Sequence, residues 1–220
     1  IKNLSMAVLA ARLCNLNKMK INRTFKKISN IEGRLELVKE YPNNIKVFVD
    51  YAHTPDALLE VLKSIRSKNN NNISLVFGCG GERDFKKRPL MSKIAKKFCK
   101  KIYVTDDNPR FEKPDKIRRQ IIKYLKGSNY KNIGNRSKAI REAITNADPN
   151  ETILVAGKGH ENSQDYGDKI IFISDKQILN KINFSKKNNN IKKKNYLSNS
   201  QILKKLTNNK KIFNFNGLSI

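Results

Sequence analysis

The segment "DDNPR" (residues 106–110) places carboxylate, amide and guanidinium side chains within five positions of one another. A proline restricts its own φ angle and pushes the preceding residue toward extended geometry, so Pro109 should hold its neighbours in a stiff arrangement. The Arg110 guanidinium suits a carboxylate, whereas Asp107 and the side-chain carbonyl of Asn108 suit an ammonium group. A surface turn with incidental charges is the alternative interpretation.

Two glycine-rich segments carry groups of the same kind. "GCGGERD" (78–84) provides Arg83 as a fork for a carboxylate or phosphate, and its glycines would let backbone N–H groups approach an anion. "GKGHE" (157–161) places Gly157 and Gly159 for close backbone approach and offers Glu161 as a second acceptor for an ammonium group. Neither segment fits G-x-G-x-x-G, and G-x-x-x-x-G-K-[ST] is absent from the sequence, so the phosphate-binding lysine loop of ATP-using enzymes is missing.

A fourth segment, "DYAHTPD" (50–56), combines an acceptor, a hydroxyl-bearing ring and an imidazole in Asp50, Tyr51 and His53. A turn that leads into a helix is the alternative interpretation, and for His53 alone it is the favoured one.

Each of these clusters follows a short apolar run rich in β-branched residues. The runs predict strands at 46–50, 73–77, 101–105 and 152–156, with another at 169–173 and a weaker one at 131–134. Amphipathic segments with helix-start signals separate them. This alternation predicts an α/β fold with a Rossmann-like, doubly wound and mostly parallel sheet.

The clearest predicted helix begins near Thr54, which can cap it, and Pro55, which suits the first helical position. The buried stripes predicted for this helix and the next three comprise Leu58, Leu62 and Ile65; Leu90, Ile94 and Phe98; Ile117, Ile121 and Leu125, ended by Gly127; and Ile140, Ala143 and Ile144.

Because the carboxyl ends of parallel strands share one edge of a sheet, and ligands bind at that edge, the four clusters should meet there. Arg83 and Arg110 would then lie near Asp107 and Glu161. The expected ligand carries both carboxylate and ammonium groups, as an amino acid does, and one with two zwitterionic ends would suit this site.

The formal net charge of +27 raises the question of nucleic-acid binding. Lys and Asn are over-used throughout the sequence, however, and no RNA-recognition signature or zinc finger accompanies them. We therefore expect no specific nucleic-acid partner, and at most electrostatic attraction of an anionic small substrate. Three cysteines without a paired framework favour a cytoplasmic location, and no apolar run approaches the roughly 18 residues of a membrane span.

Composition divides the chain into four parts. Residues 1–30 hold a short helical pattern with Leu4, Val8, Ala11 and Leu16 on one face, and 31–182 hold the α/β domain. Residues 183–196 form a Lys/Asn-rich linker that buries too little apolar surface to fold, and 197–220 resemble the opening of another unit. Since the first residue is Ile, we expect a piece of a longer protein.

The segments "GRLE" (33–36), "VDYAHTPDAL", "FGCGGERDFKKRPLM", "TDDNPR" and "VAGKGHE", in this order and spacing, resemble the carboxyl-terminal domain of the Mur ligases over roughly residues 1–180. The resemblance is to the members that add meso-diaminopimelate to UDP-N-acetylmuramoyl-L-alanyl-D-glutamate in peptidoglycan precursor synthesis. It implies an ATP-dependent ligase that forms an acyl phosphate and releases ADP.

The resemblance also implies roles for individual residues. The residues expected to bind meso-diaminopimelate are Arg83, Asp107, Asn108, Pro109, Arg110, Gly157 and Glu161. Those expected to face ATP are Arg34, Asp50, Tyr51 and His53. ATP and Mg²⁺ would be held mainly by a central ATPase domain, of which residues 1–30 resemble only the end. No catalytic residue or metal ligand is assigned within this chain, which by itself is expected to be inactive as a ligase.

Three alternatives remain open at this point. A lysine-adding or a folylpolyglutamate-type ligase is an alternative among the enzymes, and Arg110 in "DNPR" speaks against both. A non-catalytic basic binding module is the alternative outside the enzymes. Residues 197–220 weakly resemble the start of a further Mur ligase amino-terminal domain.

Overall fold

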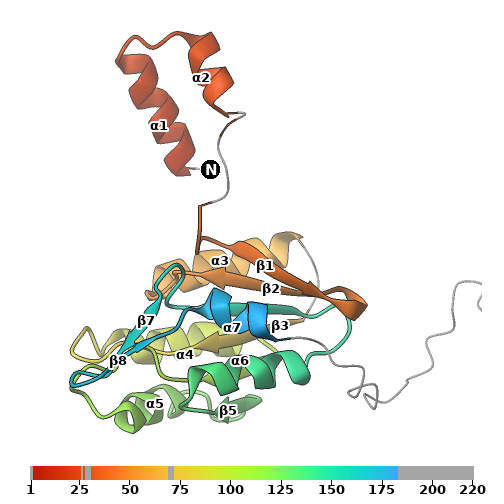
Figure 1. Ribbon diagram of the computed structural model, residues 1–220, viewed down its shortest axis with the longest axis vertical. Helices are drawn as coiled ribbons and strands as arrows, with labels where there is room; N and C mark the ends of the chain where they lie inside the picture. Colours follow the sequence, from red (N-terminus) through yellow and green to blue (C-terminus); the bar gives the residue numbers. More distant parts are fainter. Residues whose placement is uncertain (1, 26, 28–30, 69–71, 183–220) are drawn as a thin grey trace, which may run out of the picture. The chain divides into compact units, whose positions relative to one another are not determined.

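The computed structural model describes residues 2–25, 27, 31–68 and 72–182. A six-stranded sheet has the order β1-β2-β6-β3-β4-β5 (Figure 1). Its strands are β1 (Glu36–Tyr41), β2 (Ile45–Asp50), β3 (Ile73–Phe77), β4 (Lys101–Val104), β5 (Tyr130–Asn132) and β6 (Thr152–Ala156). All neighbouring pairs are parallel except β1 and β2, which are antiparallel and joined by the short 3₁₀ helix Pro42–Asn44. The predicted, mostly parallel α/β fold is confirmed.

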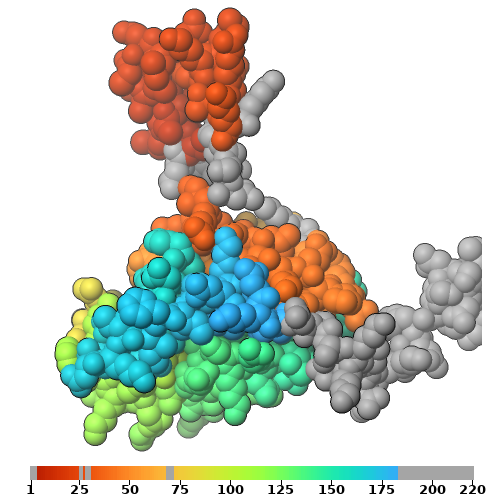
Figure 2. All heavy atoms as spheres, in the orientation of Figure 1, coloured from red at the N-terminus to blue at the C-terminus, as the bar shows by residue number. Residues whose placement is uncertain are grey.

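Helices cover both faces of this sheet (Figure 1). On one face lie α3 (Pro55–Lys68), α4 (Lys87–Phe98) and α5 (Pro114–Ile122), packed side by side over the largest buried apolar cluster. On the other face α6 (Arg136–Thr145) packs against β3, β4 and β6, and α7 (Asp175–Lys181) packs against α6 and β1. Figure 2 shows the outer surface of α6 and α7. The two helical layers leave the strand ends free to carry loops.

The predicted helix starts and stripes hold for most helices. Helix α3 begins at Pro55, and the Thr54 hydroxyl accepts a hydrogen bond from the backbone N–H of Ala57 at 3.3 Å. Its stripe is buried, as are those of α5 and α6. The stripe predicted for α4 is wrong at Leu90, which is 49% exposed. In α4 the buried residues are instead Arg88, Met91, Ser92 and Ala95. The buried face of the helix includes Arg88, whose side chain lies toward the carboxyl ends of the strands and contacts the Gly80 carbonyl after β3.

The strand predicted at 169–173 is present as β8 (Ile170–Phe172), but it lies outside the main sheet. It pairs with β7 (Ser163–Asp165) in an antiparallel hairpin, and all three of its residues are exposed. Strand β1 was not predicted, because its sequence "ELVKEY" lacks the apolar run that marks the buried strands. Charged side chains of this kind are usual on an edge strand.

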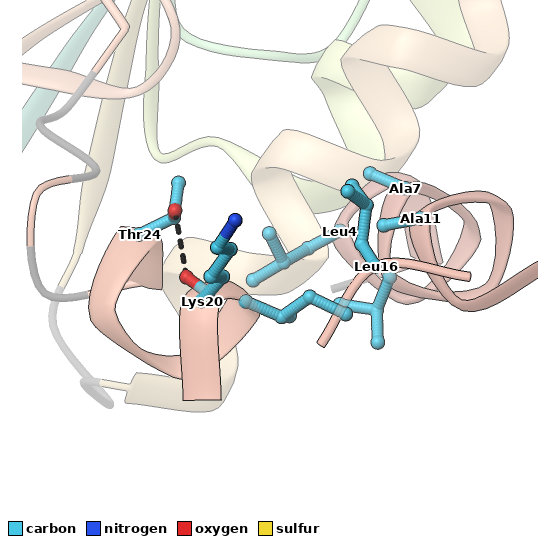
Figure 3. Close-up of a pocket in the computed structure, with 8 residues that line it drawn as sticks. Leu4, Ala7, Ala11, Leu16, Lys20 and Thr24 are labelled. Carbon is cyan, nitrogen blue, oxygen red and sulfur yellow. Dashed lines mark hydrogen bonds between the residues drawn. The ribbon is translucent and has the colours of Figure 1, made fainter. Parts of the chain in front are cut away.

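Two helices precede the sheet: α1 (Lys2–Leu13) and α2 (Lys18–Phe25). An apolar hollow between them is lined by residues that include Leu4, Val8, Ala11 and Leu16 (Figure 3). Leu4, Val8 and Ala11 share the predicted face of α1, whereas Leu16 follows the end of that helix and reaches the same hollow from the connecting turn. The Thr24 hydroxyl donates to the Lys20 carbonyl at 2.9 Å.

The chain divides into two units, Ile1–Asn183 and Phe184–Ile220. The expected linker at 183–196 and the expected tail at 197–220 lie outside the described residues. Among the residues that are described, no helix is long and apolar enough to cross a membrane.

Candidate functional site

A cleft of about 560 Å³ lies at the carboxyl ends of β2, β3, β4 and β6. All four loops that follow these strands contribute to its wall. Its lining includes Tyr51 and His53 from the first loop, Gly80 and Arg83 from the second, Asp107, Asn108 and Arg110 from the third, and Gly157 and Glu161 from the fourth. The structure therefore brings together the two arginines and the two carboxylates expected to meet at this edge.

The third and fourth loops are joined by a polar network around Lys158. The side chain of Lys158 is 1% exposed, and its Nζ donates to Asn108 Oδ1 at 2.9 Å and to Glu161 Oε2 at 2.8 Å. Asn108 Nδ2 also donates to Glu161 Oε2 at 2.9 Å. These three side chains hold one another, so the amide of Asn108 is fixed in its orientation before any ligand arrives.

Glu161 stays ionised in this network. Burial raises the pKa of Glu161, but hydrogen bonds from Lys158 and Asn108 outweigh burial, and the net pKa lies below the ordinary value of a glutamate. Its Oε2 is used by the network, and within the described residues its Oε1 accepts no hydrogen bond. Glu161 can therefore offer one carboxylate oxygen to a cationic group in the cleft.

Asp107 has an oxygen without a protein partner. The residue is 6% exposed; its Oδ1 accepts from the backbone N–H of Asn108 at 2.7 Å, and its buried Oδ2 accepts no hydrogen bond from the residues that the structure describes. Gly157, at φ +116°, makes room for this oxygen, since a Cβ at that position would lie 2.6 Å from Oδ2. A buried carboxylate oxygen left without a donor is costly, so a ligand N–H group would be favoured there.

Arg110 has φ +52°, which is unusual for a residue with a side chain. Its Nη1 donates to the carbonyls of Gly81 at 2.9 Å and Asn108 at 3.3 Å, and its Nε lies 3.8 Å from Asp165 Oδ2. No hydrogen bond in the described structure uses Nη2. The protein thus engages Nη1 and Nε of the guanidinium and leaves Nη2 for an anion.

The glycines of "GCGG" mainly serve contacts within the protein, which differs from the anion-binding role that the sequence favoured. A Cβ at Gly78 would collide with the Thr105 carbonyl, and one at Gly81 would collide with the Pro109 carbonyl. The backbone N–H of Gly81 donates to the Asn108 carbonyl at 2.9 Å. The second loop therefore packs directly on the third, and Pro109 is buried behind the cleft wall instead of lining it.

Arg83 and Lys87 supply the cleft with positive charge. Arg83 is exposed and, within the described residues, takes part in no hydrogen bond or ion pair. Lys87 Nζ donates to the His53 carbonyl at 2.9 Å and so ties the first loop to α4. Arg83 is the cation with most freedom to meet a carboxylate.

The carboxylate of Asp50 accepts hydrogen bonds from the protein backbone through both of its oxygens. Its Oδ2 accepts from the Leu35 N–H at 2.6 Å and its Oδ1 from the Ala52 N–H at 2.7 Å. Burial raises the pKa of Asp50 above its ordinary value despite these hydrogen bonds. Both oxygens serve the backbone and Asp50 does not line the cleft, although it holds in place the turn that carries Arg34.

Arg34 lies over the ring of Tyr51, with 4.9 Å from its Cζ to the ring centroid. The Tyr51 ring also lies 4.6 Å from the His53 ring and 5.4 Å from the His160 ring, measured between centroids. This partly exposed group of aromatic and cationic side chains offers a surface on which a flat ring could stack.

Two functional contributors were missed by sequence reasoning. Lys158 stands between Gly157 and Gly159 in the sequence, in the loop that follows a buried strand. This position was the signal from which a role in the site could have been predicted. Arg88 is 1% exposed; its Nη2 donates to the Gly80 carbonyl at 3.1 Å, and its two Nη groups form a bidentate pair with Glu112 at 2.8 and 2.7 Å. No local pattern marks Arg88, because its partners lie on other loops.

Metal binding has little support in this part of the protein. Among the described residues, no three histidine, cysteine, aspartate or glutamate side chains gather as they would around an ion.

Comparison with known proteins identifies the family to which the chain belongs. The family model described as Mur ligase, glutamate ligase domain, matches residues 33–159. The UDP-N-acetylmuramoyl-L-alanyl-D-glutamate–2,6-diaminopimelate ligase of Rickettsia typhi is 40% identical over 185 residues, covering 83% of this chain and 37% of the relative. Ligase 1 of the same name from Clostridium acetobutylicum is 42% identical over 161 residues, covering 73% and 33%.

Solved structures agree with the sequence comparisons. A structure of a UDP-N-acetylmuramoyl-L-alanyl-D-glutamate–2,6-diaminopimelate ligase is 32% identical, with a TM-score of 0.63, and covers 79% of this chain and 36% of that one. A bifunctional folylpolyglutamate synthase/dihydrofolate synthase from Yersinia pestis is 20% identical with a TM-score of 0.51, and this likeness shows the fold alone. The chain spans about a third of the length of these relatives.

Proposed function

The chain belongs to the Mur ligase family through its glutamate ligase domain, and from this premise we propose that it binds the incoming amino acid in an ATP-dependent ligase. The amino acid is meso-diaminopimelate, and the acceptor is UDP-N-acetylmuramoyl-L-alanyl-D-glutamate. The names of the relatives at 40% and 42% identity support both assignments. The reaction belongs to peptidoglycan precursor synthesis, and the predicted location is the cytoplasm.

One observation carries the proposal: four loops place two arginines and three carboxylates, including Asp107 and Glu161, around a single cleft. meso-Diaminopimelate has an ammonium and a carboxylate group at each end, and such a ligand needs acceptors and donors in the same cleft. Arg83 and Arg110 would bind carboxylates, and Asp107 Oδ2 and Glu161 Oε1 would accept from ammonium groups. Asn108 and Gly157 would complete the wall between them.

Arg110 is the residue that would separate diaminopimelate from lysine. The two amino acids differ by one distal carboxylate, which needs a cation that the rest of the cleft does not already use. The Nη2 of Arg110 meets that need, because Nη1 is held by two backbone carbonyls. A lysine-adding ligase would leave this group without its anion.

In the proposed reaction, the γ-carboxylate of the D-glutamyl residue attacks the γ-phosphorus of ATP and displaces ADP. The amine of diaminopimelate then attacks the acyl carbon of the acyl phosphate, loses a proton and displaces phosphate. The contribution of this chain is to orient the amine, and orientation alone can supply several kcal/mol of barrier reduction. Holding the far end of the amino acid on Arg110 and Glu161 is how the cleft would achieve it.

ATP would meet this chain through the surface formed by Arg34, Tyr51 and His53, where an adenine ring could stack. The sequence lacks a phosphate-binding lysine loop, and the described residues contain no cluster of three or more potential metal-ligand side chains. We therefore assign the phosphates and Mg²⁺ no ligand in this chain. Asp50 would act on this surface only through the turn it holds.

Isothermal titration calorimetry of the chain with meso-diaminopimelate, L-lysine and a DNA oligomer tests the proposal. We expect diaminopimelate to bind at least about tenfold tighter than lysine, the effect of one charged hydrogen bond. Equal affinities would remove the assigned specificity. A salt-sensitive DNA affinity without amino-acid binding would instead favour a basic binding module.

A further inference from the structure

The β7–β8 hairpin (163–172) lies against the loop 106–110, although more than fifty residues separate the two segments. Three consecutive hairpin residues, Gln164, Asp165 and Tyr166, contact this loop by hydrogen bonds. None of the three lines the cleft. These three residues therefore stand behind the cleft wall, where they can determine how the loop presents its side chains.

Gln164 makes the most buried of these contacts. It is 4% exposed, and its Nε2 donates to two consecutive backbone carbonyls, those of Asp106 at 3.2 Å and Asp107 at 3.0 Å. A buried carbonyl that loses its donor is destabilised, so both peptide groups depend on this one amide. Gln164 thereby fixes the backbone that carries the unpartnered Oδ2 of Asp107.

Asp165 holds the other end of the loop. Its backbone N–H donates to Asn108 Oδ1 at 3.1 Å, and its carbonyl accepts from the backbone N–H of Arg110 at 2.9 Å. The second contact stabilises Arg110 in its positive φ conformation. The Asp165 carboxylate lies 3.8 Å from Arg110 Nε, so it also biases the guanidinium.

Asp106 anchors the start of the loop to the same hairpin. Its Oδ2 accepts from the Tyr166 hydroxyl at 3.2 Å, and its Oδ1 is paired with Arg118. The hairpin end is packed as well, because Gly167 lies against the ring of Phe111, where a Cβ would come within 2.7 Å of the ring. The hairpin and the loop thus behave as one packed unit.

We propose that Gln164 and Asp165 are positioning residues that set the selectivity of the cleft for an amino acid with a distal carboxylate. The inference rests on the proposed function and adds a part of the protein that lies outside the cleft. Arg110 binds the distal carboxylate, and the hairpin determines the position of Arg110. Without the hairpin contacts, the loop still carries its charges but loses the spacing between them.

Two substitutions at one position test the role of the buried amide. Gln164→Glu and Gln164→Met both remove the Nε2 donor, and only the first adds a charge. We expect both to lower the ratio of the lysine Kd to the diaminopimelate Kd by about tenfold, the effect of roughly one hydrogen bond. The lysine Kd should rise less than the diaminopimelate Kd, because lysine shares the ammonium contact with Asp107 but has no distal carboxylate for Arg110.

Asp165→Asn provides a second test if the Gln164 variants fail to fold. The Asp165 side chain is 41% exposed, so this substitution should leave the fold intact. It should lower the ratio by a smaller factor at unchanged Tm. Asp168→Asn is the matched control, as an exposed acid of the same hairpin that makes no ion pair within the described residues, and it should leave the ratio unchanged.

The two proposals fail in different ways. If the unmodified chain shows no preference for diaminopimelate over lysine, both the proposed function and this inference are refuted. If the unmodified chain has the preference and the Gln164 and Asp165 variants keep it, or lose both affinities in parallel, only the positioning role is overturned.

Discussion

Replacing Lys158 by Met tests whether the network behind the cleft is held together by charge. Nζ of Lys158 is buried and makes two hydrogen bonds, at 2.9 Å to Asn108 and 2.8 Å to Glu161. Hydrogen bonds to charged groups contribute about 1.5–3 kcal/mol each, and breaking a buried pair costs about 3–5 kcal/mol. The Glu161 side chain is 32% exposed, and solvent therefore weakens the pair. We expect K158M to lower the free energy of unfolding by about 2–4 kcal/mol.

A double-mutant cycle isolates the pair from its surroundings. E161Q should cost less than K158M, since a glutamine carbonyl still accepts from Lys158. The coupling between the two substitutions should be about 1–2 kcal/mol, because each removes the same ion pair. The chain contains no tryptophan, so urea unfolding is best followed by far-ultraviolet circular dichroism.

The pH dependence has a defined sign. The pKa of Glu161 is lower in the folded protein than its ordinary value, so the pair adds stability above the unfolded pKa, about 4.3, and loses it as pH falls through the folded pKa. The difference between K158M and the unmodified chain should be full at pH 7 and shrink below about pH 4. A coupling indistinguishable from zero, or a difference that does not change with pH, would refute the ionic account.

Three further substitutions probe the cleft and its support. Arg110→Lys keeps the charge but loses the fork, and calorimetry should show diaminopimelate binding weakened by about 1–3 kcal/mol with lysine binding unchanged; equal losses would contradict the assigned role. Gly157→Ala places a methyl 2.6 Å from Asp107 Oδ2 at φ +116°, so urea unfolding should show a loss of about 2–4 kcal/mol, and a neutral effect would show that the loop can move aside. Arg136→Met leaves Asp175 buried without its bidentate partner at 2.7 Å and should lower the free energy of unfolding by about 3–5 kcal/mol. The double variant Arg136→Met with Asp175→Leu should recover much of that stability. A double variant as unstable as the single one would mean that the packing of the arginine, and not its charge, stabilises this site.

The buried strands and their order along the chain could be predicted from local pattern. Strands β2, β3 and β6 are apolar runs with covered faces, and such runs stand out wherever they occur. Strand β1 and the place of β8 could not be predicted. Their residues are polar or exposed, so burial left no periodic mark on them.

The sequence by itself determined which loops meet. Once strands and helices alternate, the carboxyl ends of parallel strands must share an edge, and the residues that follow them must gather there. Arg83, Arg110 and Glu161 could be assigned to one cleft on that ground alone.

Only the tertiary structure decided which atoms remain free for a ligand. Asp50 turns both oxygens to backbone N–H groups, whereas Asp107 keeps one oxygen unpartnered. The partners that make this difference come from elsewhere in the chain: Lys158 fixes Asn108 across fifty residues, and Gln164 holds the backbone of the loop from a hairpin that lies outside the main sheet. Hydrogen bonds are short and directional, so their partners are selected by how the loops pack in space, which spacing along the sequence does not encode.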